Sequence, residues 1–152
     1  MVRISSLLAS AFLGLGLFAA GAFAADRPFA VIAAPSASDH RLTREAVALI
    51  FRRKLSFWDN GQRIQPVNLP PVHPLRRNFS LSVLGQPPEA LDDYWREMYF
   101  HGVRPPHVLA SEEAVALFVA ATPGAIGYVS TCIPEGKVTV VFAAGDLPGC
   151  AR

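Results

Sequence analysis

Apolar residues change their spacing along the chain, and the changes predict strands that alternate with helices. Residues 28–34 form a short apolar run that ends at Pro35, which is typical of a buried strand. Residues 63–69 alternate loosely, and two further apolar runs cover 125–129 and 138–143. Between these runs the apolar spacing becomes helical. The pattern predicts one α/β domain with a mixed or mainly parallel sheet of about four to five strands, flanked by helices.

Three of the predicted helices are marked by residues that favour a helix start. Thr43 and Ser111 are side chains that cap the first backbone N–H groups of a helix. Pro74, directly after His73, has a backbone angle already suited to the first helical position. Gly85 is expected to end the helix that begins at Pro74.

The most regular helical spacing lies between residues 91 and 99, where apolar and aromatic side chains recur at three- and four-residue intervals. An aromatic stripe can serve as a platform for a sugar or a nucleotide, but this spacing is more typical of a helix face in the core. We therefore expect core positions at Leu91, Tyr94, Trp95, Met98 and Tyr99.

The first residues have the pattern of a secretory signal peptide. Arg3 precedes an uncharged apolar stretch over residues 7–20, and Ala22-Phe23-Ala24 matches the small-x-small motif before a cleavage site. A membrane anchor needs about 20 apolar residues, and this stretch is shorter. We expect cleavage after Ala24 or Ala25 and a periplasmic location.

Cleavage would divide the chain into a signal peptide, residues 1–24, and a single domain, residues 25–152. The chain has 14 Lys and Arg against 12 Asp and Glu, and only Arg3 of these would be removed, which leaves 13 basic and 12 acidic groups. This near-neutral balance does not favour nucleic-acid binding, which requires a clear basic excess on one face.

Two cysteines, Cys132 and Cys150, follow the predicted signal peptide. In an oxidising compartment a single pair favours a disulfide, and a loop of this size would contribute roughly 3 kcal/mol. A metal or redox pair is less well supported because the sequence has no Cys-x-x-Cys motif.

Motifs that would indicate catalysis are absent. The sequence has no Gly-x-Ser-x-Gly motif, no glycine-rich phosphate loop, and no zinc-type spacing among its four histidines. We therefore expect no enzymatic activity, no catalytic residue, no metal and no cofactor. The remaining candidate chemistry is anion binding at helix N-termini, whose free N–H groups favour negative charge.

The order of motifs resembles the phosphate-type periplasmic substrate-binding proteins of ABC transporters. The resemblance covers residues 30–130 and is most specific at residues 42–58, LTREAVALIFRRKLSFW, and at 122–129, TPGAIGYV. It implies a periplasmic-binding-protein type II fold. Full members have two lobes that close on the ligand, whereas the expected domain is long enough for about one.

The resemblance also points to departures at the ligand site. Leu69 and Pro71 stand near the family's Arg and Asp, and residues 72–75 stand near its Ser-Gly-Thr segment, so the usual oxyanion clamp is missing. His73, Arg76 and Arg77 could act as substitutes. With the hydroxyls of the preceding loop and cap, the candidate ligand-binding residues are Ser36, Ser38, Thr43, His73 and Arg76.

Two functions follow from the sequence. The first is a periplasmic solute-binding protein that holds a small oxyanion such as phosphate at helix N-termini and works with an ABC transporter permease. The second is a binding lobe that has lost its ligand and acts as an interaction or sensory module for other envelope proteins.

Overall fold

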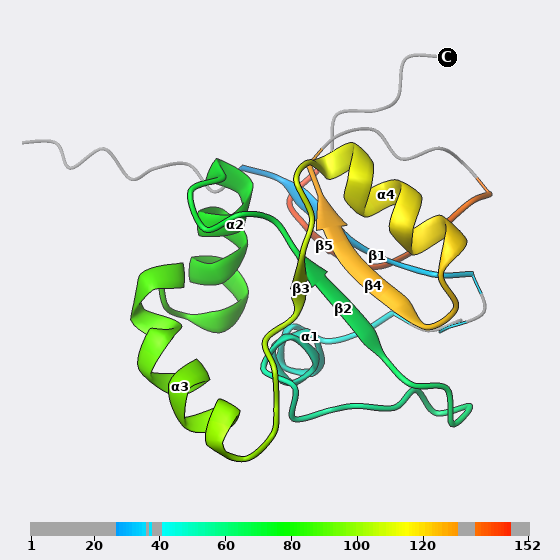
Figure 1. The fold of residues 1–152 in the computed structure, drawn as a ribbon. Helices are drawn as coiled ribbons and strands as arrows, with labels where there is room; N and C mark the ends of the chain where they lie inside the picture. Colours follow the sequence, from blue (N-terminus) through cyan, green and yellow to red (C-terminus); the bar gives the residue numbers. More distant parts are fainter. Residues whose placement is uncertain (1–26, 36, 38–40, 131–135, 147–152) are drawn as a thin grey trace, which may run out of the picture.

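A five-stranded mixed sheet with helices on both faces makes up the domain (Figure 1). The computed structural model describes residues 27–35, 37, 41–130 and 136–146. The strands are β1 (Phe29–Ala33), β2 (Gln65–Asn68), β3 (His107–Val108), β4 (Ala125–Val129) and β5 (Thr139–Ala144). The helices are α1 (Arg44–Phe51), α2 (Pro74–Phe79), η1 (Ser80–Leu84), η2 (Pro88–Leu91), α3 (Asp92–Phe100) and α4 (Glu112–Ala121).

The strands lie in the order β3-β2-β4-β1-β5. Strand β2 is parallel to β3 and β4, whereas β1 is antiparallel to β4 and β5. This arrangement confirms the predicted α/β class and the mixed sheet. The sequence pattern did not predict β3, which has two residues and pairs with the end of β2.

Two neighbouring residues of β4 show how the two faces of the sheet are covered, because successive side chains of a strand point to opposite faces. On one face, α4 packs so closely over Gly127 that an added Cβ would lie 2.5 Å from a methyl group of Val115. On the other face, the ring of Tyr128 stacks on Phe79 of α2 at 3.9 Å and contacts Phe51 of α1. The core therefore occupies two layers, one on each side of the sheet.

The three predicted helix starts are confirmed. In each case the side chain of the cap accepts a hydrogen bond of 3.2 Å from a backbone N–H of the first turn, and the pairs are Thr43 with Ala46, His73 with Leu75, and Ser111 with Ala114. Helix α2 continues through the π-helical η1 and ends at Gly85, which has a φ of 72°. Its predicted end is also confirmed.

The prediction that the aromatic stripe forms part of the core is wrong for most of its length. Leu91, which precedes α3, is buried, but no residue of α3 itself is buried, and 64% of Tyr99 is exposed. Helix α3 meets the rest of the domain through Trp95, which packs against the core, and through the Tyr94 hydroxyl, which donates to the carbonyl of Arg52 at 2.7 Å. Within the described part of the chain, no element covers the opposite side of α3.

Gly124 stands at a turn that tolerates no side chain, and we expect Gly124→Ala to lower the free energy of unfolding by about 3 kcal/mol. Its φ of 77° costs an L-residue roughly 1–2 kcal/mol. An added Cβ would also overlap the carbonyl oxygen of Arg63, which belongs to the backbone and cannot rotate away. Urea unfolding measures the loss.

The matched control for this prediction is Gly61→Ala. Gly61 has a φ of 80°, but nothing lies within 4 Å of the added Cβ. The control should therefore lose only the part of the free energy of unfolding that comes from the positive φ, roughly 1–2 kcal/mol. Equal losses in the two variants would show that the contact with Arg63 has no effect.

Several sequence predictions lie outside the described residues. These are the signal peptide over residues 1–24 and the disulfide between Cys132 and Cys150. Across the described ranges, none of the helices has the length and apolar character needed to cross a bilayer.

Candidate functional site

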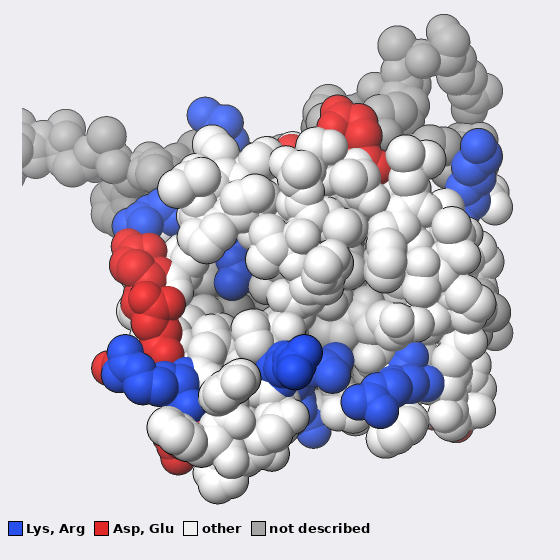
Figure 2. Space-filling view, in the orientation of Figure 1, with Lys and Arg blue, Asp and Glu red and all other residues white. Residues whose placement is uncertain are grey.

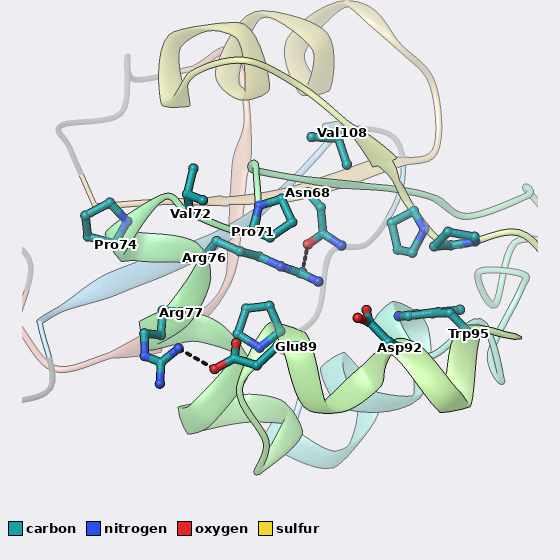
Figure 3. Close-up of a pocket in the computed structure, with 13 residues that line it drawn as sticks. Asn68, Pro71, Val72, Pro74, Arg76, Arg77, Glu89, Asp92, Trp95 and Val108 are labelled. Atoms are coloured by element: carbon teal, nitrogen blue, oxygen red, sulfur yellow. Dashed lines mark hydrogen bonds and ion pairs between the residues drawn. The ribbon is translucent and has the colours of Figure 1, made fainter.

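A pocket of about 840 Å³ opens where the parallel strands β2 and β3 end (Figure 3). Asn68 and Val108, the last residues of these two strands, pair with each other and both line the pocket. The other walls come from the start of α2, from η2 and from the first turn of α3. In α/β sheets the carboxyl ends of parallel strands are the usual place for a ligand.

The most unusual group in the pocket is the guanidinium of Arg76. Only 7% of this residue is exposed, and its Nη1 donates a hydrogen bond to Oδ1 of Asn68. Its Nε is buried and has no hydrogen-bond partner among the described residues. Within the same residues, Arg76 forms no ion pair with a carboxylate. The pocket therefore contains a buried guanidinium with no carboxylate at ion-pair distance among the described residues.

The oxygen that holds Arg76 is itself fixed from the core. The hydroxyl of Tyr128 donates to the same Oδ1 of Asn68 at 3.1 Å and accepts from the backbone N–H of Leu69 at 3.3 Å. Burial raises the pKa of Tyr128, so its hydroxyl stays protonated and remains a donor at neutral pH. The stacked ring of Phe79 holds Tyr128 in place. A continuous set of contacts thus connects the core to the guanidinium.

The other charged residues of the pocket lie at its rim. Arg77 and Glu89 form an exposed ion pair at 2.8 Å, and the hydrogen bond from Arg77 lowers the pKa of Glu89. Asp92 also lines the pocket and forms no ion pair with a cation of the described residues. Figure 2 shows the pocket as a hollow with a basic group at its floor and charged side chains of both signs along one rim. No group of His, Cys, Asp or Glu in the described ranges is arranged to hold a metal ion.

Of the predicted ligand residues, Arg76 lies in the pocket, whereas His73 lies beside it. Val72 and Pro74 line the pocket, but His73 between them does not. The Nδ1 of His73 accepts from the backbone of Leu75, so the side chain serves as a helix cap. The ligand contact of His73 stays a prediction, and the structure gives this residue the role of a helix cap beside the pocket.

Thr43 is not among the residues that line the pocket. Its hydroxyl accepts from the backbone N–H of Ala46, so the side chain serves as the cap of α1. Leu42, the residue before it, donates its backbone N–H to Val141 of β5 at 2.7 Å. Ser36 and Ser38 lie outside the described residues.

The sequence analysis missed the contribution of Asn68. A signal was available, because Asn68 is a polar residue between Val67 and Leu69 near the end of the loosely alternating strand predicted over residues 63–69. Asn68 is 4% exposed, and both of its neighbours, Val67 and Leu69, are fully buried. A buried amide needs partners, and here these are Arg76 and Tyr128.

Two solved structures resemble this fold. One is an ABC-type phosphate transport receptor from Vibrio cholerae, with 17% identity, a TM-score of 0.50, and coverage of 74% of this chain and 44% of that protein. The other, from Clostridium perfringens, is assigned as a phosphate ABC transporter substrate-binding protein and has bound phosphate. It has 18% identity, a TM-score of 0.56, and coverage of 76% and 45%.

These similarities support the predicted fold at the level of architecture. The chain spans less than half the length of either structure. No protein-family model matches the chain, and no curated protein does either.

Proposed function

We propose that this chain is a solute-binding lobe that holds a small oxyanion against Arg76. The observation that carries the proposal is the buried guanidinium, which lines a pocket and has no carboxylate partner among the described residues. The location at the ends of parallel strands and the similarity to two phosphate-transport proteins support it.

The energetics of the guanidinium favour an anionic ligand. A charge removed from water costs several kcal/mol unless an opposite charge or a set of hydrogen bonds compensates for it. Arginine is well suited to oxyanions because its fork of N–H donors can bind two oxygens at once. A bound oxyanion would supply the missing negative charge. The ligand would thus stabilise a site that is costly when empty.

The wider physiological role is also part of the proposal. If residues 1–24 are a signal peptide, the domain works in the periplasm and delivers its solute to an ABC transporter permease. The chain spans 44–45% of the two phosphate-transport structures, and in this proposal a second lobe or a partner subunit covers the open side of the pocket. Such a partner would complete the enclosure that small-molecule sites usually have.

One observation favours the alternative role as an interaction module of the envelope. The end of α3 exposes two neighbouring aromatic residues, Tyr99 at 64% and Phe100 at 83%. Exposed aromatic residues are enriched at protein interfaces. The interaction module would bind a protein through α3 and would not respond to anions.

The first test is thermal unfolding of the purified protein with phosphate, sulfate, molybdate and carboxylates at constant ionic strength. A ligand at 100 times its Kd should stabilise the fold by about 2.7 kcal/mol. Arg76→Gln should abolish this stabilisation, whereas Arg63→Gln, the same change at an exposed position outside the pocket, should retain it. A flat response to every anion at millimolar concentration would rule out the solute-binding role and leave the interaction module.

A further inference from the structure

We infer that the preferred ligand is an organic carboxylate with one negative charge and an apolar body, and not inorganic phosphate. This inference rests on the proposed function, because it assigns the chemical class of the anion that Arg76 holds. Three features of the pocket carry it: the chemistry of the walls, the size of the cavity and the balance of charge.

The walls of the pocket are poor in hydrogen-bond donors. Eight of the residues that line it are apolar, and five of these eight are prolines. A proline has no backbone N–H, so those five positions cannot donate to an anion through the main chain. The five prolines are Pro71, Pro74, Pro88, Pro105 and Pro106.

Inorganic phosphate fits such walls badly. Its four oxygens are strongly hydrated, and transfer from water is unfavourable unless protein donors replace the lost hydrogen bonds. The cavity of about 840 Å³ has space for roughly thirty water molecules, whereas a phosphate ion displaces roughly two or three. The apolar wall area would remain in contact with water. An organic anion can place its carboxylate at Arg76 and cover the walls with its apolar part.

The charge balance of the pocket favours a single negative charge. Arg77 is already paired with Glu89, which leaves Arg76 as the unpaired cation among the described lining residues. In Figure 3 the carboxylate of Asp92 points toward the guanidinium of Arg76 from the opposite wall, without an ion pair between them. A second negative charge on the ligand would be repelled by Asp92.

Trp95 provides the surface for the apolar body. It lines the pocket one helical turn after Asp92 and is partly buried against the core, so it forms a firm wall. Val108 completes the apolar surface from the end of β3, and its side chain is half-exposed. A bound apolar chain would remove both side chains from water, and Trp95 would report binding through its fluorescence.

The deciding experiment is a fluorescence titration of the purified protein with a homologous series: acetate, butyrate, hexanoate and phenylacetate, against phosphate and sulfate. Each added methylene that is buried should lower Kd about three- to fourfold. Hexanoate and phenylacetate should bind at least tenfold more tightly than phosphate. Hexanamide, which has nearly the same chain but no charge, should bind at least tenfold more weakly than hexanoate.

Substitutions test where the carboxylate and the apolar body of the ligand bind. Arg76→Gln should weaken every carboxylate at least tenfold, and Arg63→Gln should weaken none. Val108→Ser should reduce the gain per methylene, so that hexanoate loses more affinity than acetate, because it changes the apolar wall and not the guanidinium. Val108 is half-exposed, so this change should not prevent folding.

The possible results separate this inference from the proposed function. If phosphate binds as tightly as hexanoate and Arg76→Gln abolishes both, the oxyanion site stands and the organic class is overturned. If Kd falls along the series but Arg76→Gln has no effect, the chains bind elsewhere and the inference also fails. If no anion binds at 10 mM, the proposed function itself fails.

Discussion

Phe79→Ala is expected to lower the free energy of unfolding by about 3–5 kcal/mol, a large part of the stability of a domain of this size. Phe79 is fully buried at the centre of an aromatic cluster. Its ring stacks on Tyr128 at 3.9 Å and 3°, and it contacts Phe51 at 4.7 Å and Phe29 at 5.7 Å. Alanine would leave a cavity between α1, α2 and the sheet. Urea unfolding at constant pH measures the change.

Phe100→Ala provides the matched control, since it removes the same side chain from the exposed end of α3. Phe100 is 83% exposed, so the expected change is within about 0.5 kcal/mol. A loss as large as that of Phe79→Ala would mean that α3 is buried by a second surface in solution. Analytical ultracentrifugation of the same samples would identify a second copy of the chain as that surface.

The sequence predicted the elements well where local residues decide them. Thr43 and Ser111 cap their helices in the structure, and Gly85 ends the segment that begins at Pro74. These signals depend only on the few residues around each helix end, which can satisfy free backbone groups without help from distant parts of the chain. Strand positions followed for the same reason, from short apolar runs bounded by turn residues.

The sequence could not predict features that depend on how the elements pack. The spacing in α3 predicts an apolar face, but it does not say whether anything covers that face, and Tyr99 remains exposed. Strand β3 has only two residues, and it forms because it pairs with the end of β2 at Val67. In both cases the decisive contact comes from a distant part of the chain.

The candidate site shows the same limit. The sequence grouped Thr43, His73 and Arg76, because helix starts in an α/β domain often gather at one edge of the sheet. That grouping assumes that the preceding strands run in the same direction. Strand β1, which precedes Thr43, is antiparallel to β4, whereas β2, which precedes His73, is parallel to it. Of these three residues, only Arg76 lines the pocket.

Arg76→Met should make the protein more stable in the absence of ligand, by about 1–2 kcal/mol, while abolishing the stabilisation that anions give. The buried guanidinium carries a desolvation penalty of several kcal/mol, which its hydrogen bond to Asn68 offsets only by about 1.5–3 kcal/mol. Methionine replaces the apolar stem of the arginine with a flexible apolar side chain that carries no charge and ends short of the guanidinium position. Asn68 keeps the hydroxyl of Tyr128 as a donor, so no new buried group loses its partner.

The control and the two conditions make this prediction specific to a binding role. Arg52→Met also removes a guanidinium, one that donates to the carbonyl of Leu84 at 2.8 Å but remains partly exposed, and it should lower stability by up to about 1 kcal/mol. Urea unfolding of both variants is compared in anion-free buffer and with the tightest-binding carboxylate. If Arg76→Met lowers the free energy of unfolding in anion-free buffer, the guanidinium stabilises the fold and its role is structural. If Arg76→Met is more stable than the wild-type protein and the ligand does not stabilise it further, the wild-type protein keeps an unfavourable buried charge because ligand binding requires it.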